Sequence, residues 1–383
     1  MIPRTIFAEE HEIFRASVRR FLAEHVMPYH AAWEAAGEVP RDLWIKAGEL
    51  GLLCCAVPEA YGGMGGDFLL SAILVEEFAA AGATGPTFYL HSDIVAPYLV
   101  DFGTEAQRAR WLPRMATGEA VGALGMSEPS GGSDVAAMRT HARRDGDEYV
   151  INGQKVFITN GHTADFLLLA CKTDPDAGAR GVSLIIVETD RPGFERGRKL
   201  DKLGCRAQDT SELFFSDLRV PVTNLLGEEG KGFKMLMTQL AQERLIQAIR
   251  AVSSAESALR WTIAYTSERQ MFGHTLADFQ NTRFELADLH ARILAQRVFI
   301  DRCTELHTEG QLDATDAAAA KLVTTELQGE AMDRCLQLFG GWGYMWEYPI
   351  TRAFADARMS RIGGGAVEVM KQIIANSLLP KSA

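Results

Sequence analysis

The sequence predicts an α+β protein that is mostly helical and has three parts: an N-terminal helical domain (residues 1–120), a β domain (121–230) and a C-terminal helical bundle (231–383). Two observations lead to this fold class. Apolar residues recur at helical spacing in the outer parts, whereas between Val121 and Leu226 they form short runs separated by turn signals. Because no helix of credible length interrupts those runs, we expect an antiparallel sandwich or barrel.

The first part reads as a series of helices with glycine and proline between them. Apolar residues at helical spacing predict a helix over residues 7–22. Pro40 begins a second helix that should end near Gly51. Two further helices are expected over residues 67–81 and 104–116.

The middle part contains short runs rich in β-branched and aromatic residues, at residues 149–151, 156–158, 166–170, 182–187 and 213–215. Turn signals such as Asp145-Gly146-Asp147, Asn152-Gly153 and Arg191-Pro192-Gly193 separate them. The last part predicts long helices over residues 233–271, 282–309, 313–338 and 366–378. Helices of this length near the C-terminus favour an antiparallel four-helix bundle.

Composition excludes several classes of function. Fifty acidic residues against 39 basic ones give a formal charge of −11, which argues against nucleic acid or anionic lipid as a partner. None of the six cysteines forms a CxxC pair or a His/Cys cluster, so we expect reduced thiols and no metal site. No apolar run approaches the ~20 residues of a membrane span. Residues 1–25 resemble neither a secretory signal nor a transit peptide, so we expect a soluble, cytoplasmic protein.

Several motifs have both a functional and a plain structural interpretation. The small residues of Ser127–Asp134 would let a backbone approach a ring or phosphate, or would simply form a turn. Phe157 and Thr159 are expected on one face of a strand. That face could bind a ligand, or the two residues could simply belong to the core and the edge of the sheet. Arg269 could reach a pyrophosphate or interact with a helix dipole. The glycines in Gln337–Gly341 exceed what a helix cap requires.

Glu243 lies on the same helical stripe as Leu236, Leu240 and Gln247, whereas Arg244 points about 100° away. A carboxylate beside apolar groups has a raised pKa, as a general base needs, although a lone helical Glu is more often on a solvated face. Gly62–Gly66 follows no predicted strand, so a Rossmann nucleotide site is not supported.

Taken together, these motifs resemble the acyl-CoA dehydrogenase family along nearly the whole chain, and most closely its long-chain and isovaleryl members. The resemblance rests on Met126–Pro129 with Gly132–Asp134, Asn152–Gly161, Glu243-Arg244, Arg269 with Phe272-Gly273, Gln280, Gln337–Gly341, and Asp356–Arg358 with Arg361-Ile362. Each string is weak alone, but their order and spacing on a helix–sheet–helix layout match the family.

The resemblance implies an FAD enzyme that converts an acyl-CoA thioester to a trans-2-enoyl-CoA. A carboxylate takes the α proton and the flavin N5 takes the β hydride, and electrons pass to an electron-transferring flavoprotein. It also implies a homotetramer, a dimer of dimers, in which a neighbouring subunit completes each flavin site.

The resemblance further assigns cofactor-binding residues. Those from one chain are Leu124, Met126, Ser127, Ser133, Phe157, Ile158 and Thr159; those completing the site from its partner are Arg269, Phe272, Gln280, Gln337, Leu338, Phe339, Gly340 and Gly341; Ala366 and Glu368 lie at the last helix. Two positions depart from the family. Ala366 replaces a Thr or Asn that contacts the flavin, and Phe157 replaces a Trp and lacks its N–H donor.

Glu243 is the expected catalytic base. Many members carry the base just before the last helix, where this chain has Gly364, so the Glu-Arg pair of the long-chain and isovaleryl members is the match. Substrate-binding residues are expected to be Ser133, Lys234, Ala241, Gln242, Arg244, Gly364 and Gly365, with residues near Tyr89, His91 and Ile94 at the floor of the acyl slot.

Two alternatives stay open at this stage. One keeps the fold and flavin but reacts with O₂, as an acyl-CoA oxidase or flavin monooxygenase. The other, motivated by Ala366, is a flavin-free helical interaction protein.

Overall fold

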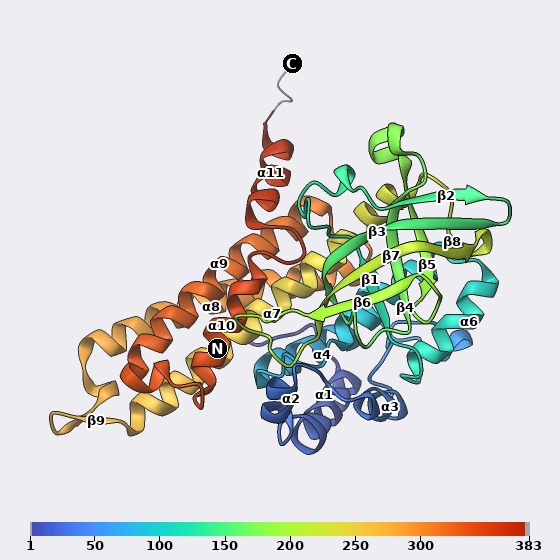
Figure 1. Cartoon of the computed structure of the whole chain (residues 1–383). Helices are drawn as coiled ribbons and strands as arrows, with labels where there is room; N and C mark the ends of the chain where they lie inside the picture. The colour runs from blue at the N-terminus through green and yellow to red at the C-terminus, as the bar shows by residue number, and fades with distance from the viewer. Residues whose placement is uncertain (1, 380–383) are drawn as a thin grey trace.

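The computed structural model describes residues 2–379 and has a helical part, a sheet and a projecting helical bundle (Figure 1). The first part comprises α1 (Glu9–Phe21), η1 (Leu22–Val26), α2 (His30–Ala36), α3 (Arg41–Glu49), α4 (Phe68–Ala81), η3 (Leu90–Val95), α5 (Ala96–Phe102) and α6 (Glu105–Ala116). The expected start of the last of these is confirmed in detail. Thr104 is its N-cap, and Gln107 completes a capping box that satisfies two backbone N–H groups.

One sheet forms the middle of the chain. Its strands are β1 (Gly122–Gly125), β2 (His141–Asp145), β3 (Glu148–Thr159), β4 (Phe166–Lys172), β5 (Val182–Glu188), β6 (Phe194–Lys199), β7 (Thr210–Pro221) and β8 (Leu225–Leu226). They run in the order β6-β7-β3-β2-β4-β5-β8, and β1 pairs with β4. Most pairs are antiparallel as expected, but β1 and β2 each lie parallel to β4.

The predicted turn at Asn152-Gly153 is wrong, because both residues lie inside β3. The strand bulges there instead: the Asn152 side chain accepts from the Asp217 N–H at 2.9 Å, and Gly153 adopts φ +145°. A Cβ on Gly153 would lie 2.6 Å from Thr140 Oγ1, so this glycine serves close packing. The sequence analysis also missed β2 and β6, whose residues are mostly polar and exposed.

The third part contains α7 (Gly232–Glu268), α8 (Gln280–Thr308), α9 (Ala314–Phe339), α10 (Pro349–Ser360) and α11 (Val367–Leu378). The first predicted helix of this part was too long at its C-terminus. The chain leaves α7 at Arg269 and forms a hairpin of β9 (Gln270–Met271) and β10 (His274–Thr275) at the outer end of the bundle (Figure 1). The short α10 was not expected; it begins with Pro349, whose fixed φ suits a first helical turn.

A buried charge cluster joins the first part to the bundle. Glu76 of α4 is 5% exposed and accepts hydrogen bonds from Arg4 (2.6 Å), Arg15 (2.9 Å) and Arg297 of α8 (3.0 Å). Burial opposes ionisation of Glu76, but the three guanidinium groups outweigh it and lower its pKa to about 2. The cluster therefore fixes α4 against the long bundle helices, next to which the candidate site lies.

No helix within residues 2–379 is long and apolar enough to cross a membrane. The six cysteines are all buried and none is in a disulfide, as the expectation of reduced thiols requires.

Candidate functional site

A buried ion pair anchors the Ser127–Asp134 loop to the sheet. Lys155 of β3 is fully buried and donates to Glu128 Oε1 and to the Met126 carbonyl, each at 2.9 Å. Glu128 also accepts from the backbone N–H groups of Arg139 (2.7 Å) and Thr140 (3.0 Å). The Glu128 carboxylate thus has protein partners on both of its oxygens. We infer that Glu128 and Lys155 hold the loop in position. Leu124, Met126 and Ser127 are half-buried along it, while Ser133 is exposed.

Phe157 lies at a strained and exposed position of β3. Its φ is +61° and its side chain is 67% exposed, although large aromatic side chains are normally buried. Ile158 is 3% exposed, and the half-buried Thr159 accepts a hydrogen bond from Gln208 Nε2 at 2.9 Å. The exposed aromatic face is therefore present, but β3 is irregular between Lys155 and Ile158, so the shared face of Phe157 and Thr159 stays a prediction.

Two buried polar atoms near Thr159 have no hydrogen-bond partner in the described residues. They are Gln208 Oε1 and Ser211 Oγ, and Ser211 pairs with Ile158 across the sheet. Orphaned buried polar atoms cost free energy unless a ligand or water satisfies them. A flat ring with polar edges, as in a flavin, fits an exposed aromatic face flanked by such atoms. The sequence analysis missed Gln208, which no motif marked.

Glu243 is half-buried in the middle of α7. Desolvation raises the pKa of this carboxyl above its ordinary value, while the Lys321 ammonium and the Arg244 guanidinium act in the opposite direction. The interpretation as a solvated surface carboxylate is therefore wrong. The desolvated carboxylate stands beside two cations, an arrangement that can hold or accept a proton.

Gly364 lies directly against Glu243. A Cβ at position 364 would be 3.3 Å from Glu243 Oε1 and 3.4 Å from Gln247 Cγ, and the backbone φ there is +63°. Glu243 and Gly364, the two positions at which the resemblance expects a base to be possible, thus lie against each other. Any side chain at Gly364 would crowd the carboxylate and be strained as well.

Lys321 of α9 is the neighbour of Glu243 that the sequence analysis missed. Its side chain is fully buried, and its ammonium donates to the carbonyl of Gly365. Burial lowers its pKa to about 8, and Glu243 partly offsets that effect. A single lysine after the four alanines of residues 317–320, on a helix face that packs inward, was the available signal.

The other expected substrate residues lie in different surroundings. Arg244 is buried against the Ala314 carbonyl (3.5 Å), and its Nε has no partner in the described residues. The side-chain amide of Gln242 binds protein groups: its Nε2 donates to the Asp93 carbonyl, and its Oε1 lies 2.9 Å from His307 Nε2. Ala241 is half-buried and Lys234 is exposed.

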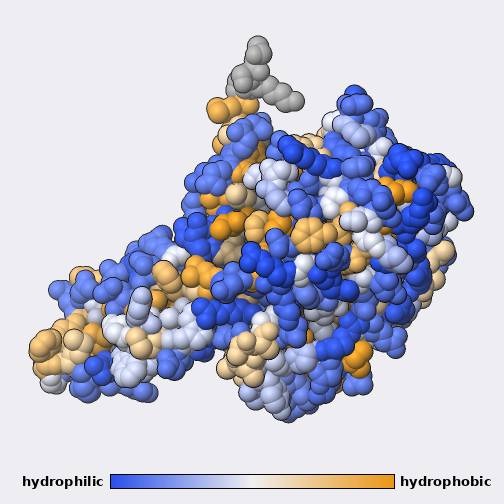
Figure 2. Space-filling view, viewed as in Figure 1, coloured by the Kyte–Doolittle hydropathy of each residue, from blue (hydrophilic) through white to orange (hydrophobic). Residues whose placement is uncertain are grey.

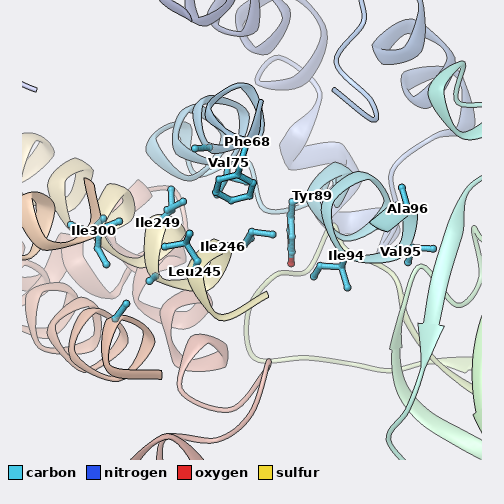
Figure 3. Packing of buried hydrophobic residues seen from close by; sticks show 14 of the residues in the cluster. Phe68, Val75, Tyr89, Ile94, Val95, Ala96, Leu245, Ile246, Ile249 and Ile300 are labelled. Carbon is cyan, nitrogen blue, oxygen red and sulfur yellow. The ribbon is translucent and has the colours of Figure 1, made fainter. Parts of the chain in front are cut away.

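Of the residues expected at the floor of the slot, His91 has a purely structural position. It is completely buried, 3.0 Å from the Met115 carbonyl and 3.1 Å from the Gly122 N–H, so it fastens η3 to the sheet. Tyr89 and Ile94 lie in the core cluster between the first part and α7 (Figure 3).

The expected partner-side residues lie apart from this region. Arg269 and Phe272 belong to the hairpin at the outer end of the bundle, far from the sheet in Figure 1. Phe272 is 87% exposed, and this end shows apolar colours on the surface in Figure 2. Gln280, Gln337, Gly340 and Gly341 are exposed as well, Leu338 is half-buried, and Phe339 is buried. One chain therefore does not bring the two residue sets together.

The start of α11 contains Ala366, the position at which the resemblance expects a Thr or Asn that contacts the flavin. Ala366 is its N-cap and supplies no side-chain cap, and Glu368 is exposed in its first turn. Gly364 and Gly365 before it adopt positive φ angles, which a larger residue would resist.

Comparison with known proteins agrees with this geometry. Family models for the N-terminal, middle and C-terminal domains of acyl-CoA dehydrogenases match residues 8–119, 123–218 and 230–379. The chain is 48% identical to the long-chain specific acyl-CoA dehydrogenase of Rattus norvegicus, covering 99% of this chain and 89% of that protein. It is 38% identical to the isovaleryl-CoA dehydrogenase of Oryza sativa, covering 97% and 92%.

A solved acyl-CoA dehydrogenase from Geobacillus kaustophilus superposes with a TM-score of 0.97 at 47% identity, covering 98% of this chain and 100% of that one. The predicted fold class is therefore confirmed. The chain belongs to the acyl-CoA dehydrogenase family, whose members are FAD-dependent oxidoreductases that act on acyl-CoA.

Proposed function

We propose that this chain dehydrogenates an acyl-CoA thioester to a trans-2-enoyl-CoA, with Glu243 taking the α proton. The observation that carries this assignment is the half-buried Glu243 carboxylate held against Gly364 and beside the buried Lys321. Bound FAD supplies the hydride acceptor for the β hydrogen. Residues Leu124–Ser133 and Phe157–Thr159 would hold its ring, since Phe157 offers an exposed aromatic face and the unpaired atoms of Gln208 and Ser211 lie beside Thr159 and Ile158.

The surroundings of Glu243 suit a base that must take a proton from a weak carbon acid. Desolvation raises the pKa of the carboxyl, which makes its ionised form a stronger base. The opposing charge of Lys321 keeps enough of the carboxylate ionised to act. Gly364 leaves the space in which the Cα of the thioester must lie, and Lys321 holds that loop through the Gly365 carbonyl.

We further propose that two copies of the chain complete each flavin site within a homotetramer, a dimer of dimers. The set of Arg269, Phe272, Gln280 and Gln337–Gly341, which is mostly exposed, lies toward the outer end of the bundle, where only another subunit would bring it to the Phe157 face. Sedimentation velocity of the FAD-loaded protein tests this state directly.

The test of function is anaerobic titration of the FAD-loaded enzyme with a panel of acyl-CoAs while the flavin absorbance is followed. A dehydrogenase loses that absorbance and releases the enoyl-CoA. We propose an electron-transferring flavoprotein as the physiological acceptor, so the reduced enzyme should reoxidise quickly with that protein and slowly with O₂. Fast reoxidation by O₂ would favour the oxidase or monooxygenase alternative.

The flavin-free interaction protein has one observation in its favour, the missing side-chain cap at Ala366. Purified protein that stays colourless after addition of FAD would support it. The cytoplasmic location stays a prediction, and the names of the rat and rice relatives place those proteins in mitochondria.

A further inference from the structure

One side chain holds the turn of α7 that carries Glu243 to two other elements. The Nε2 of Gln242 donates to the Asp93 carbonyl of η3, and its Oε1 lies 2.9 Å from His307 Nε2 of α8. We call these three groups, the Asp93 carbonyl, the Gln242 amide and the His307 imidazole, the Gln242 bridge. Both ends of the amide are bonded to protein, and the proposed mechanism gives this residue no part.

The Asp93 end of the bridge has a local cause in the sequence. In an α-helix the Asp93 carbonyl would accept from the backbone N–H of the residue four positions on. That residue is Pro97, which has no N–H, and the chain forms the π-helical turn η3 just before it. Gln242 therefore supplies a donor to a carbonyl that lacks its α-helical partner. The Asp93 side chain binds elsewhere, since its Oδ1 accepts from Ser71 Oγ of α4 at 2.6 Å.

The His307 end of the bridge has a defined direction. An amide oxygen only accepts hydrogen bonds, so the ring nitrogen that faces it, Nε2, must carry the hydrogen. Burial lowers the pKa of His307 to about 4, so the ring is neutral at neutral pH and keeps this tautomer. The Phe68 ring of α4 packs edge-on against the imidazole, with the ring centres 4.4 Å apart. His307 thus presents one N–H to Gln242 in one orientation.

The two partners require an amide at position 242. The Asp93 carbonyl needs a donor, and the His307 N–H needs an acceptor; among side chains of this length only glutamine carries both in one planar group. A glutamate would accept from His307, but its ionised form would place a carboxylate oxygen against the Asp93 carbonyl. A methionine would form neither bond. The identity of Gln242 therefore follows from the groups it joins.

The bridge lies where it can control the place of the base. Because Gln242 and Glu243 are neighbours on α7, a movement of this turn moves the Glu243 carboxylate. α7 packs against η3, and Figure 3 shows Ile246 of α7 and Ile94 of η3 on either side of Tyr89. Tyr89 and Ile94 are among the residues expected at the floor of the acyl slot. The bridge therefore joins the element that carries the base to an element expected to line the slot.

We propose that Gln242 is a positioning residue: the bridge sets the distance between the Glu243 carboxylate and the α carbon of the thioester, and Gln242 itself does not bind the substrate. The inference rests on the proposed function of Glu243. A displacement of a catalytic group by about 1 Å costs roughly 100-fold in rate. Loss of the bridge therefore slows proton removal without weakening substrate binding.

The experiment is anaerobic stopped-flow reduction of the FAD-loaded enzyme by the acyl-CoA of the panel that the unaltered enzyme turns over fastest. It yields the limiting rate of flavin reduction and the apparent Kd of the acyl-CoA. Gln242→Met removes both bonds at a similar side-chain length. We expect the limiting rate to fall roughly ten- to 100-fold and the Kd to change by less than about twofold.

Gln239→Met is the matched control. Gln239 lies three residues earlier on α7, and its Nε2 donates to Asp101 Oδ2 at 2.6 Å, so the variant also removes an amide that joins α7 to another helix. It should reduce its flavin at the normal rate, because this bond lies outside the bridge.

A double variant tests whether the bridge acts as one unit. His307→Leu removes the donor to Gln242 Oε1 and should also slow flavin reduction. Combined with Gln242→Met it should cause no further loss, because both substitutions remove the same bond. Losses that add would show that the two side chains act separately, as a general loss of packing would, and would overturn the inference.

The remaining outcomes also separate the inference from the proposed function. A normal limiting rate in Gln242→Met, or equal slowing in Gln239→Met, overturns the inference and leaves the dehydrogenase proposal intact. A raised Kd at a normal limiting rate makes Gln242 a substrate contact instead. Failure of every acyl-CoA to bleach the flavin of the unaltered enzyme refutes the proposed function, and the inference with it. If Gln242→Met does not fold, Gln242→Asn, whose amide is one methylene too short to reach both partners, makes the same comparison.

Discussion

The contact between Gly364 and Glu243 gives a prediction whose size follows from the structure. In Gly364→Ala the new methyl group would lie 3.3 Å from Glu243 Oε1, a few tenths of an ångström closer than ordinary contact. Misplacing a catalytic group by about 1 Å costs roughly 100-fold in rate. We therefore expect flavin reduction by acyl-CoA to slow roughly three- to tenfold, measured by anaerobic stopped-flow absorbance.

The same substitution also strains the backbone. The control variant must therefore introduce the same backbone strain without a contact to Glu243. Gly310 has φ +70° and no atom within 4 Å of its Cβ position, close to the +63° of Gly364 but outside the site. Both alanine variants should lose roughly 1 kcal/mol in free energy of unfolding, since a left-handed residue costs about 1–2 kcal/mol and the stiffer unfolded chain returns up to about 1. If the flavin of Gly364→Ala is reduced no more slowly than that of Gly310→Ala, the contact between position 364 and Glu243 does not affect catalysis.

Three further predictions follow from the buried charges. Lys321→Met removes a charge that lowers the pKa of Glu243, so the acid limb of the pH profile of flavin reduction should move to higher pH; a purely structural lysine would leave the limb in place. Glu76→Gln leaves Arg4, Arg15 and Arg297 without their common carboxylate and should cost about 3–5 kcal/mol in denaturant unfolding, and a loss below 1 kcal/mol would contradict the cluster's role. Because the folded pKa of Glu76, about 2, is depressed below its unfolded value, its stabilisation is present at neutral pH and is lost as pH falls from about 5 to 2; acid unfolding that is identical in Glu76→Gln would refute this assignment.

The sequence predicted what local chemistry controls. The helix after Thr104 begins where its capping box requires, and the long bundle helices follow from apolar periodicity. Asn152-Gly153 misled because its turn signal is local, whereas the bulge depends on Thr140 and Asp217, which lie on two neighbouring segments. β2 and β6 were missed because their residues are mostly polar, so they lack the apolar pattern by which a strand is recognised in a sequence.

Some residues of the candidate site could likewise be predicted from the sequence, and others could not. Glu243 and Gly364 were predicted because the family pattern marks both positions, although they lie 121 positions apart in the chain. Lys321 and Gln208 belong to no motif, and their place in the candidate site arises only from which groups surround them after folding. Burial of a cation or an unpaired amide is a tertiary property that sequence spacing does not encode.

The most direct test of the account is the rate at which Glu243→Gln transfers hydrogen from acyl-CoA to its flavin. The FAD-loaded variant should keep its flavin and its fold but lose roughly 100- to 10,000-fold in the reduction rate, the contribution of a general base. Glu268→Gln, an exposed carboxylate on the same helix, should react at the normal rate. Normal flavin reduction in Glu243→Gln would show that another group removes the α proton.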